Sequence, residues 1–167
     1  MESSGLWRSN TSSSSVKQKL LSVRIGNPHS LWGEVKFNPQ DQEYLSSPDM
    51  PGDCARAVIA SLLDLSISAV PHFLHLANRT AEGFYHRIEE FLESHGYAMA
   101  WHATPMYHLH EGIDVYHYIS GPSPRGGGLF HAVVGLNGNV VHDPHPSREG
   151  LLGNPNDWKY SFLVKIK

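Results

Sequence analysis

Cysteine is almost absent from this chain: its 167 residues include one, Cys54. A single cysteine cannot form a disulfide within the chain, so the hydrophobic core must hold the fold by itself. A domain of this length buries roughly two thirds of the surface that its unfolded chain exposes, which is sufficient without covalent cross-links. A lone thiol fits a reducing compartment best, and we therefore expect a cytoplasmic protein.

Charge and long apolar runs are also scarce. Charged residues make up 17% of the chain, and its net charge is −3 with neutral histidines. No basic run suggests a nucleic-acid partner, and no apolar stretch approaches the length of a membrane span. The Ser-rich, acid-poor start faintly resembles an organelle transit peptide, although a disordered tail explains it equally well. We therefore expect neither a nucleic acid nor a membrane as partner.

The first part of the chain differs from the rest in composition. Residues 1–22 are Ser-rich and show no hydrophobic periodicity, so we expect a disordered tail there. The remainder, residues 23–167, alternates apolar segments with turn residues and has the length of one domain. The chain is therefore predicted to consist of a tail and a single domain.

Apolar periodicity predicts two helices followed by a series of strands. The sequence CARAVIASLLDL is apolar almost all round and predicts a buried helix over residues 54–65, with Asp53 as its N-cap. A second helix is predicted over residues 80–95, with Gly96 as its stop. Strands are predicted over residues 97–103, 114–120, 129–135, 139–143 and 159–166. Helices followed by a run of antiparallel strands predict an α+β fold.

The first candidate catalytic group is Cys54, which is expected to be the first helical residue and to reach solvent in part. The reactive form of cysteine is the thiolate, which the positive end of the helix dipole favours. Free backbone N–H groups at the same helix end can bind the oxyanion of an acyl-transfer intermediate. Gly52 leaves room for a substrate, so Gly52 and Asp53 are predicted to contact it. The alternative is a buried structural cysteine.

His131 and Asp143 lie on two predicted strands that the hairpin signal Asn137-Gly138 joins. A two-residue loop would put the two side chains on opposite faces. A three-residue loop, with Gly138 in the left-handed conformation, pairs residue 135 with residue 139 and sets His131 directly across from Asp143. We predict the second loop, in which the carboxylate orients the imidazole that deprotonates a nucleophile. The alternative is a polar histidine at a sheet edge.

The glycine-rich segment over residues 123–128 comes just before the candidate base. It could form a rim that binds substrate, with Arg125 holding a carboxylate and Gly126 beside it, or it could be a loop in solvent. The sequence leaves these two interpretations open.

Histidine is abundant, with twelve in the chain. The pairs His108/His110 and His142/His145 could bind a metal, and a metal hydrolase that uses them is one alternative function. Neither pair has a Cys, Asp or Glu spaced as a clear third ligand. We therefore expect no metal and no other cofactor.

Two segments resemble a known family. The sequence GDCARAVIASLLDLSISAVPHF, which begins at Gly52, is similar to the nucleophile helix of small papain-like proteins of bacteria and bacteriophages. The sequence SGPSPRGGGLFHAVVGLNGNVVHDPHPSREGL is similar to their histidine and aspartate segment. The wider relatives are the bacteriocin-leader-processing (double-glycine) peptidases, in which a Cys-His-Asp triad sits on a papain-like fold. The resemblance covers about residues 40–152 and implies Cys54, His131 and Asp143 as the triad.

The resemblance also implies a papain-like fold, with the nucleophile helix packed on an antiparallel sheet. An oxyanion-hole glutamine is expected upstream of the cysteine, with Gln42 as the first candidate and Gln40 as the second. On this basis we expect a hydrolase that cleaves a peptide, isopeptide or amide bond of a peptide or protein substrate through a thioester. Deamidation and acyl transfer stay open because they use the same site. The main alternative is a catalytically silent papain-like binding protein, such as a phage factor that acts on a host protein.

Overall fold

The computed structural model describes residues 37–76, 80–102 and 114–166. The predicted tail lies outside the described residues. The helices are α3 (Cys54–Leu62), η1 (Ile67–Ala69), α4 (Phe73–Leu76), α5 (Ala81–Ser94) and η2 (Pro155–Asp157). The strands are β1 (Tyr97–His102), β2 (Tyr116–Pro122), β3 (Phe130–Leu136), β4 (Asn139–His142) and β5 (Lys159–Lys165).

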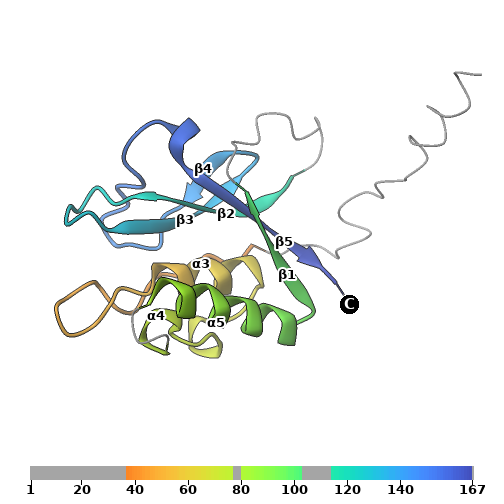
Figure 1. Ribbon diagram of the computed structural model, residues 1–167. Helices are drawn as coiled ribbons and strands as arrows, with labels where there is room; N and C mark the ends of the chain where they lie inside the picture. Colours follow the sequence, from red (N-terminus) through yellow and green to blue (C-terminus); the bar gives the residue numbers. More distant parts are fainter. Residues whose placement is uncertain (1–36, 77–79, 103–113, 167) are drawn as a thin grey trace, which may run out of the picture.

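The strands form one antiparallel sheet in the order β1-β5-β2-β3-β4. The helices α3, α4 and α5 lie together on one face of this sheet (Figure 1). Contacts of α3 with β2 and β3 and of α5 with β1 join the two layers. This arrangement confirms the predicted α+β class and the predicted helix–sheet packing.

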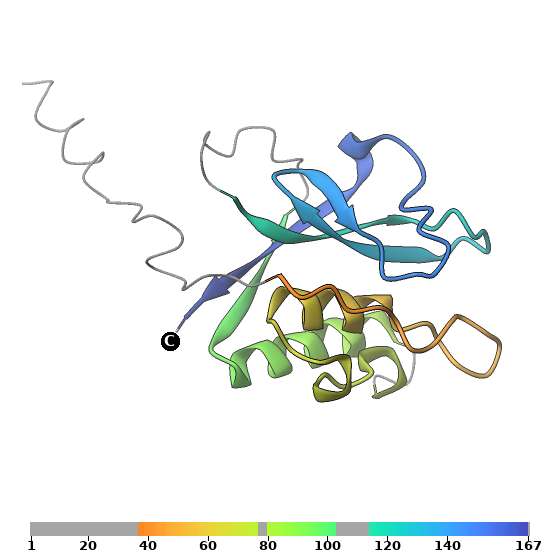
Figure 2. The same ribbon diagram turned by 180° about the vertical axis from the view of Figure 1, so that it is seen from behind.

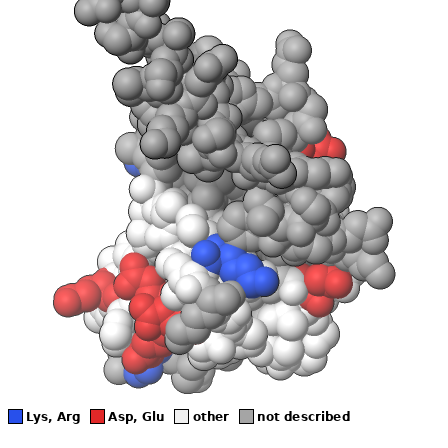
Figure 3. Space-filling model, turned by 90° about the vertical axis from the view of Figure 1, so that its right-hand side faces the viewer, with Lys and Arg blue, Asp and Glu red and all other residues white. Residues whose placement is uncertain are grey.

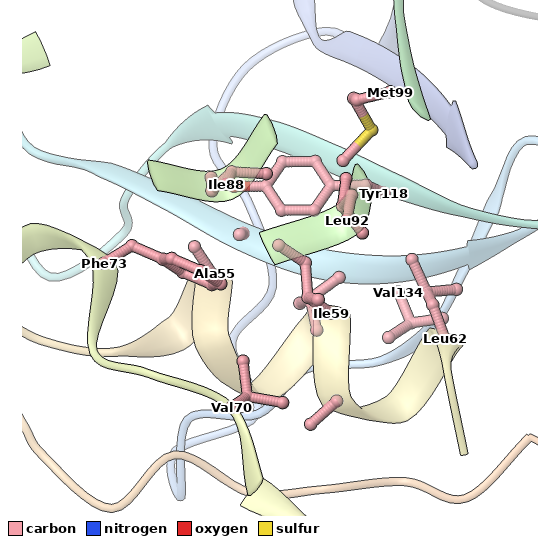
Figure 4. Close-up of a cluster of buried hydrophobic side chains, with 13 residues drawn as sticks. Ala55, Ile59, Leu62, Val70, Phe73, Ile88, Leu92, Met99, Tyr118 and Val134 are labelled. Carbon is pink, nitrogen blue, oxygen red and sulfur yellow. The ribbon is translucent and has the colours of Figure 1, made fainter. Parts of the chain in front are cut away.

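The main core lies between α3 and the sheet (Figure 4). Ile59 of α3 and Val134 of β3 are fully buried in it, and Ile88 of α5 closes it from the second helix. Phe73, 1% exposed, is the first residue of α4 and joins that helix to the same core. Each such side chain contributes about 1.5–3 kcal/mol when fully buried, so α3 is held chiefly by its apolar residues.

The start of α3 confirms one prediction and corrects another. The helix begins at Cys54, and Asp53 occupies the N-cap position, but the Asp53 side chain forms no capping hydrogen bond. Its carboxylate instead accepts a hydrogen bond from the backbone N–H of Tyr44 at 2.9 Å and forms an ion pair with Arg56 at 3.1 Å. A guanidinium next to it and an N–H of another segment thus compete successfully with the helix N–H groups for the same oxygens.

The end of α3 comes earlier than expected. The helix stops at Leu62 rather than at residue 65, and Asp64 adopts a left-handed conformation with φ 55°. Asp is one of the few residues that tolerate this conformation. The turn lets the chain reverse toward η1.

The hairpin of β3 and β4 differs from the predicted loop. Its loop has two residues, because Leu136 pairs with Asn139, and both Asn137 and Gly138 have positive φ. This is the pattern of a tight type I′ turn, which Asn-Gly favours. By itself it would put His131 and Asp143 on opposite faces. A β-bulge between residues 134 and 135 shifts the register by one residue and returns Asp143 to the face of His131.

The segment before α3 runs along that helix from its C-terminal end to its N-terminus (Figure 2). At the C-terminal end, the backbone N–H of Gln40 donates to the Ser61 hydroxyl at 2.8 Å. At the N-terminus, Tyr44 accepts a hydrogen bond from the backbone N–H of Asp53 at 3.2 Å. These contacts hold residues 40–44 along α3, up to the end of the helix where Cys54 lies.

Two surface features complete the description. On the face drawn in Figure 3, the described acidic side chains form separate groups with a small basic group between them. Among the described residues, no single helix is long and apolar enough to cross a membrane. The stretches Cys54–Leu62 and Ile67–His75 reach that length only together, and they are bent by 101°.

Candidate active site

Cys54 stands at the N-terminus of α3 and is half-buried, as the sequence predicted. It packs against the main core and lines an open cavity. Only the first helical N–H groups lack partners within a helix, so the thiol lies where unpaired donors are concentrated. This position combines a fixed backbone with access from solvent.

His131 and Asp143 are joined by a short hydrogen bond. The Nε2 atom of His131 lies 2.6 Å from Oδ1 of Asp143, and both side chains are almost fully buried. The bond occupies Nε2, which leaves Nδ1 as the ring nitrogen for the thiol of Cys54. Cys54 and His131 also line the same cavity, and the roles of nucleophile, base and orienting carboxylate stay predictions.

The Asp143 carboxylate is held by backbone donors as well as by the imidazole. The N–H of His145 donates to Oδ1 at 2.8 Å, and the N–H of Gly150 donates to Oδ2 at 2.7 Å. Arg125 adds a cation 3.8 Å from Oδ2. A buried carboxylate with this many donors is fixed in position and stays ionised.

These contacts shift the pKa values of His131 and Asp143 in opposite directions. Burial raises the pKa of Asp143, but the hydrogen bonds from His131 and from two backbone N–H groups outweigh it and lower that pKa to about 2. Burial lowers the pKa of His131, but hydrogen bonds to Asp143 and Cys54 outweigh it and raise that pKa. The site thus favours a charged imidazolium between two potential anions.

A cavity of about 870 Å³ opens beside Cys54 and His131, which both line it. Its apolar lining comes from α4, α5, β1 and the start of β3, and includes Phe73, Phe84, Tyr85, Trp101, Leu129 and Phe130. A cavity of this size lies within the roughly 300–1,000 Å³ that small-ligand sites occupy. We call it the active-site groove.

The predicted substrate contacts at Gly52 and Asp53 have structural partners. Both residues line the groove. A Cβ on Gly52 would lie 2.7 Å from the hydroxyl of Ser46, so the close approach of that loop itself calls for glycine. The Asp53 carboxylate is 2% exposed and pairs with Arg56, which also bonds Glu43 at 2.7 Å. Asp53 therefore connects the N-terminus of α3 to Arg56 and to the preceding segment. Substrate binding by Gly52 or Asp53 stays a prediction.

The two candidate glutamines contact different neighbours of α3. The side-chain oxygen of Gln40 accepts a hydrogen bond from the N–H of Ile67 at 3.1 Å, near the C-terminal end of α3. Gln42 lies nearer the start of α3, because its side-chain nitrogen donates at 2.6 Å to the Tyr44 carbonyl. That carbonyl also bonds the N–H of Asp53. Gln42 is therefore the better placed of the two.

The two glutamines also differ in how completely they are bonded. The side-chain oxygen of Gln42 is buried and has no hydrogen-bond partner among the described residues. Neither glutamine lines the active-site groove. The oxyanion role of Gln42 stays a prediction.

The glycine-rich segment before β3 lies beside the carboxylate rather than in the groove. Arg125 donates to the hydroxyl of Ser147 at 3.0 Å and faces Asp143 and Glu149 at 3.8 Å each. Gly126 is exposed, has φ 78° and has open space around it. Neither residue is among those that line the groove, and substrate binding by them stays a prediction.

The histidine pairs can be placed only in part. His108 and His110 lie outside the described residues. His142 bonds the carbonyl of Gln40 at 2.9 Å, and His145 bonds Ser147 at 2.9 Å. Within residues 37–76, 80–102 and 114–166, no three His, Cys, Asp or Glu side chains are grouped as a metal site would require.

Sequence reasoning missed the aromatic wall of the groove and the supports of Asp143. Arg148, which donates to the backbone carbonyl of Asp143 and pairs with Asp41 at 2.7 Å, follows the aspartate by five residues. Its closeness to Asp143 in the sequence could have indicated that it contacts the aspartate. Tyr85 and Trp101 come from different elements, and no spacing in the sequence links them to Cys54.

Comparison with known proteins adds no relative: no family model, no curated protein and no solved structure matches this chain.

Proposed function

We propose that this chain is a cysteine hydrolase with a papain-like fold, in which Cys54 attacks a carbonyl carbon and forms a thioester. The observation that carries the proposal is the buried 2.6 Å bond between His131 and Asp143, with Cys54 lining the same cavity as the imidazole and helping to raise its pKa. A structural histidine has no need of a carboxylate on one side and a thiol on the other. That order is the one nucleophilic catalysis requires.

The reaction follows from the site in two steps. His131 takes the thiol proton as the sulfur attacks, and the tetrahedral oxyanion forms beside the N–H groups at the start of α3. The imidazolium then gives its proton to the leaving amine, and the thioester remains on Cys54. A water that His131 deprotonates next hydrolyses the thioester and restores the free thiol. Asp143 keeps the ring oriented and stabilises its charge throughout.

One observation favours a second candidate, a binding protein that keeps the fold without the activity. Neither Gln40 nor Gln42 lines the active-site groove, so neither candidate glutamine is in place as an oxyanion donor. Loss of one oxyanion donor costs about 10²–10³ in kcat in an acyl-transfer enzyme. The backbone donors alone would then support weak turnover at best.

The presence of one cysteine makes a direct test simple, because any thiol adduct must be on Cys54. We expect p-nitrophenyl acetate to acetylate the protein and the acetyl group to be released again, as followed by intact mass and by nitrophenol formation. His131→Ala should slow acetylation by about 10³-fold or more, because the variant lacks the imidazole that takes the thiol proton. Cys54→Ala should give no adduct at all.

The outcome separates the two candidates. Equal acetylation of the wild type and His131→Ala, or an adduct that persists, would sink the hydrolase and favour the binding protein. A Gln42→Ala variant then tests the oxyanion role. It should lower turnover about 10²-fold if the amide swings toward the thioester. Gln40→Ala is the matched control, because that side chain only bonds Ile67 and its neighbours.

A further inference from the structure

The groove that Cys54 lines also has an aromatic corner. Tyr85 of α5 and Trp101 of β1 meet edge to face, with ring centroids 4.8 Å apart and an interplanar angle of 87°. The indole N–H donates to Glu89 at 3.1 Å, which fixes the Trp101 ring. The rings are nevertheless 47% and 41% exposed. Large aromatic surfaces that are fixed and exposed are typical anchors for an apolar group of a partner.

A second exposed apolar wall stands next to the catalytic histidine. Leu129 is 51% exposed and Phe130 is 70% exposed, although both line the groove. They come immediately before His131 in the chain, and the imidazole lines the same groove. The groove is therefore apolar on both sides and continuous with the nucleophile.

The polar residues that line the groove favour a peptide as occupant. They include Ser120 of β2, which is partly exposed and whose hydroxyl can donate to or accept from a peptide backbone, and the more deeply buried Ser161 of β5. Lys159 adds a positive charge at the same surface. A hydrocarbon chain would offer these polar groups no hydrogen bond, which disfavours it.

We propose that the active-site groove selects peptide substrates with a bulky apolar side chain, aromatic in preference, close to the bond that Cys54 attacks. Tyr85 and Trp101 are then specificity-determining residues. This inference rests on the proposed function, because it assumes that Cys54 is the reacting group. It predicts poor recognition of a segment made only of glycine, which offers no apolar surface to the two walls.

The test compares peptidyl chloromethyl ketones that differ in one residue, phenylalanine or glycine, at the position next to the reactive group. In each reagent the thiolate displaces chloride from the methylene carbon, forms a carbon–sulfur bond and releases chloride. We expect the wild-type protein to react at least about tenfold faster with the phenylalanine reagent. The rate constant for Cys54 alkylation is read by intact mass.

Variants then show which residues of the groove cause the preference for the phenylalanine reagent. Trp101→Ala and Tyr85→Ala should bring the ratio of the two rates close to one, whereas Trp101→Phe should keep most of it. Phe130→Ala tests the other wall at a position too exposed to endanger folding. The control is Val164→Ala on β5, because Val164 is 41% exposed like Trp101 but does not line the groove. It should leave the ratio unchanged.

Each outcome bears on one claim. A wild-type ratio below about twofold, or a ratio that folded Trp101→Ala and Phe130→Ala retain, overturns the inference. An octanoyl chloromethyl ketone that reacts faster than the phenylalanine reagent also overturns it, in favour of an acyl chain. If iodoacetamide alkylates Cys54 in a His131-dependent way while the ratio is near one, the proposed function stands and only the inference fails. If no reagent modifies Cys54, both fail.

Discussion

Two buried histidines on neighbouring strands show how one residue type serves two purposes in this sheet. His131 of β3 and His117 of β2 are 4% and 0% exposed. His131 has the Asp143 carboxylate on Nε2, whereas the Nδ1 atom of His117 lies 3.0 Å from the carbonyl of Val115. The Nε2 atom of His117 is buried without a hydrogen-bond partner among the described residues.

Their surroundings explain the opposite shifts in pKa. Burial lowers the pKa of His117, and its one backbone hydrogen bond does not compensate. The ring is enclosed by Tyr160, Phe162 and Gly135, none of which offers a charge. Burial acts on His131 in the same direction, but Asp143 and Cys54 overcome it. The difference shows that charged partners, not burial, distinguish a candidate base from a packing residue.

The strongest way to test this comparison is to remove each histidine in turn. His131→Ala should reduce hydrolysis of p-nitrophenyl acetate by about 10³-fold or more, because no other group can take the thiol proton. His117→Leu should leave that rate within about twofold, because His117 is not among the residues that line the groove. Initial rates of nitrophenol release measure both. A loss in His117→Leu as large as that in His131→Ala would show that the two histidines are not distinct in function.

The next test is to make His131 resemble His117 by removing its partner. Asp143→Asn should lower the same rate on the order of 10²-fold, less than His131→Ala does, because an amide oxygen can still orient the ring. Asp143→Ala should in addition cost roughly 2–5 kcal/mol of stability, since it leaves the imidazole and two buried N–H groups without an acceptor.

Denaturant unfolding of the two Asp143 variants measures the stability difference. Asn139→Ala on β4 is the control, because Asn139 is exposed and its side chain makes one long contact of 3.4 Å. If Asp143→Asn retained full activity, the carboxylate would be structural and the comparison with His117 would lose its basis.

The elements that define this comparison could be predicted from sequence to different extents. Local signals identified all five strands within two residues, and Asp53-Cys54 located the start of α3. The spacing of His131 and Asp143 was sufficient to join them, although through the wrong loop. Gly138 has positive φ in either loop, so the turn residues do not distinguish the two registers.

The remaining features depend on contacts between distant segments. The bulge adjoins Gly135, where a Cβ would lie 2.5 Å from Nε2 of His117, so the packing of β2 bears on the register of β3 and β4. Asp53 has its oxygens occupied by Tyr44 and Arg56 because residues 40–44 return along α3. The groove likewise combines Tyr85 and Trp101 from separate elements. None of these is encoded in a local pattern.

The smallest expected effect concerns stability against pH, where the two histidines should act with opposite sign. His117 has a lowered folded pKa, so it stabilises the fold above about pH 6.5 and this contribution is lost as the pH falls below that value. His131 has a raised folded pKa, so its contribution is complete below about pH 6.5 and is lost as the pH rises through that folded pKa. Asp143 stays ionised over this range, because its pKa is about 2.

His117→Leu isolates the first of these contributions. At about pH 8 the variant should differ from the wild type by about 1 kcal/mol or less, because it loses one hydrogen bond but also one unpartnered nitrogen. Below about pH 6.5 the variant should gain stability relative to the wild type, since unfolding no longer releases a histidine that can take up a proton. The difference between the two proteins cancels the contributions of the other histidines, including His145, whose pKa is also lowered. Thermal melts between about pH 5 and pH 8 measure that difference. A constant difference across this range would mean that His117 is protonated equally in the folded and unfolded chains, and the contrast between the two histidines would then rest on geometry alone.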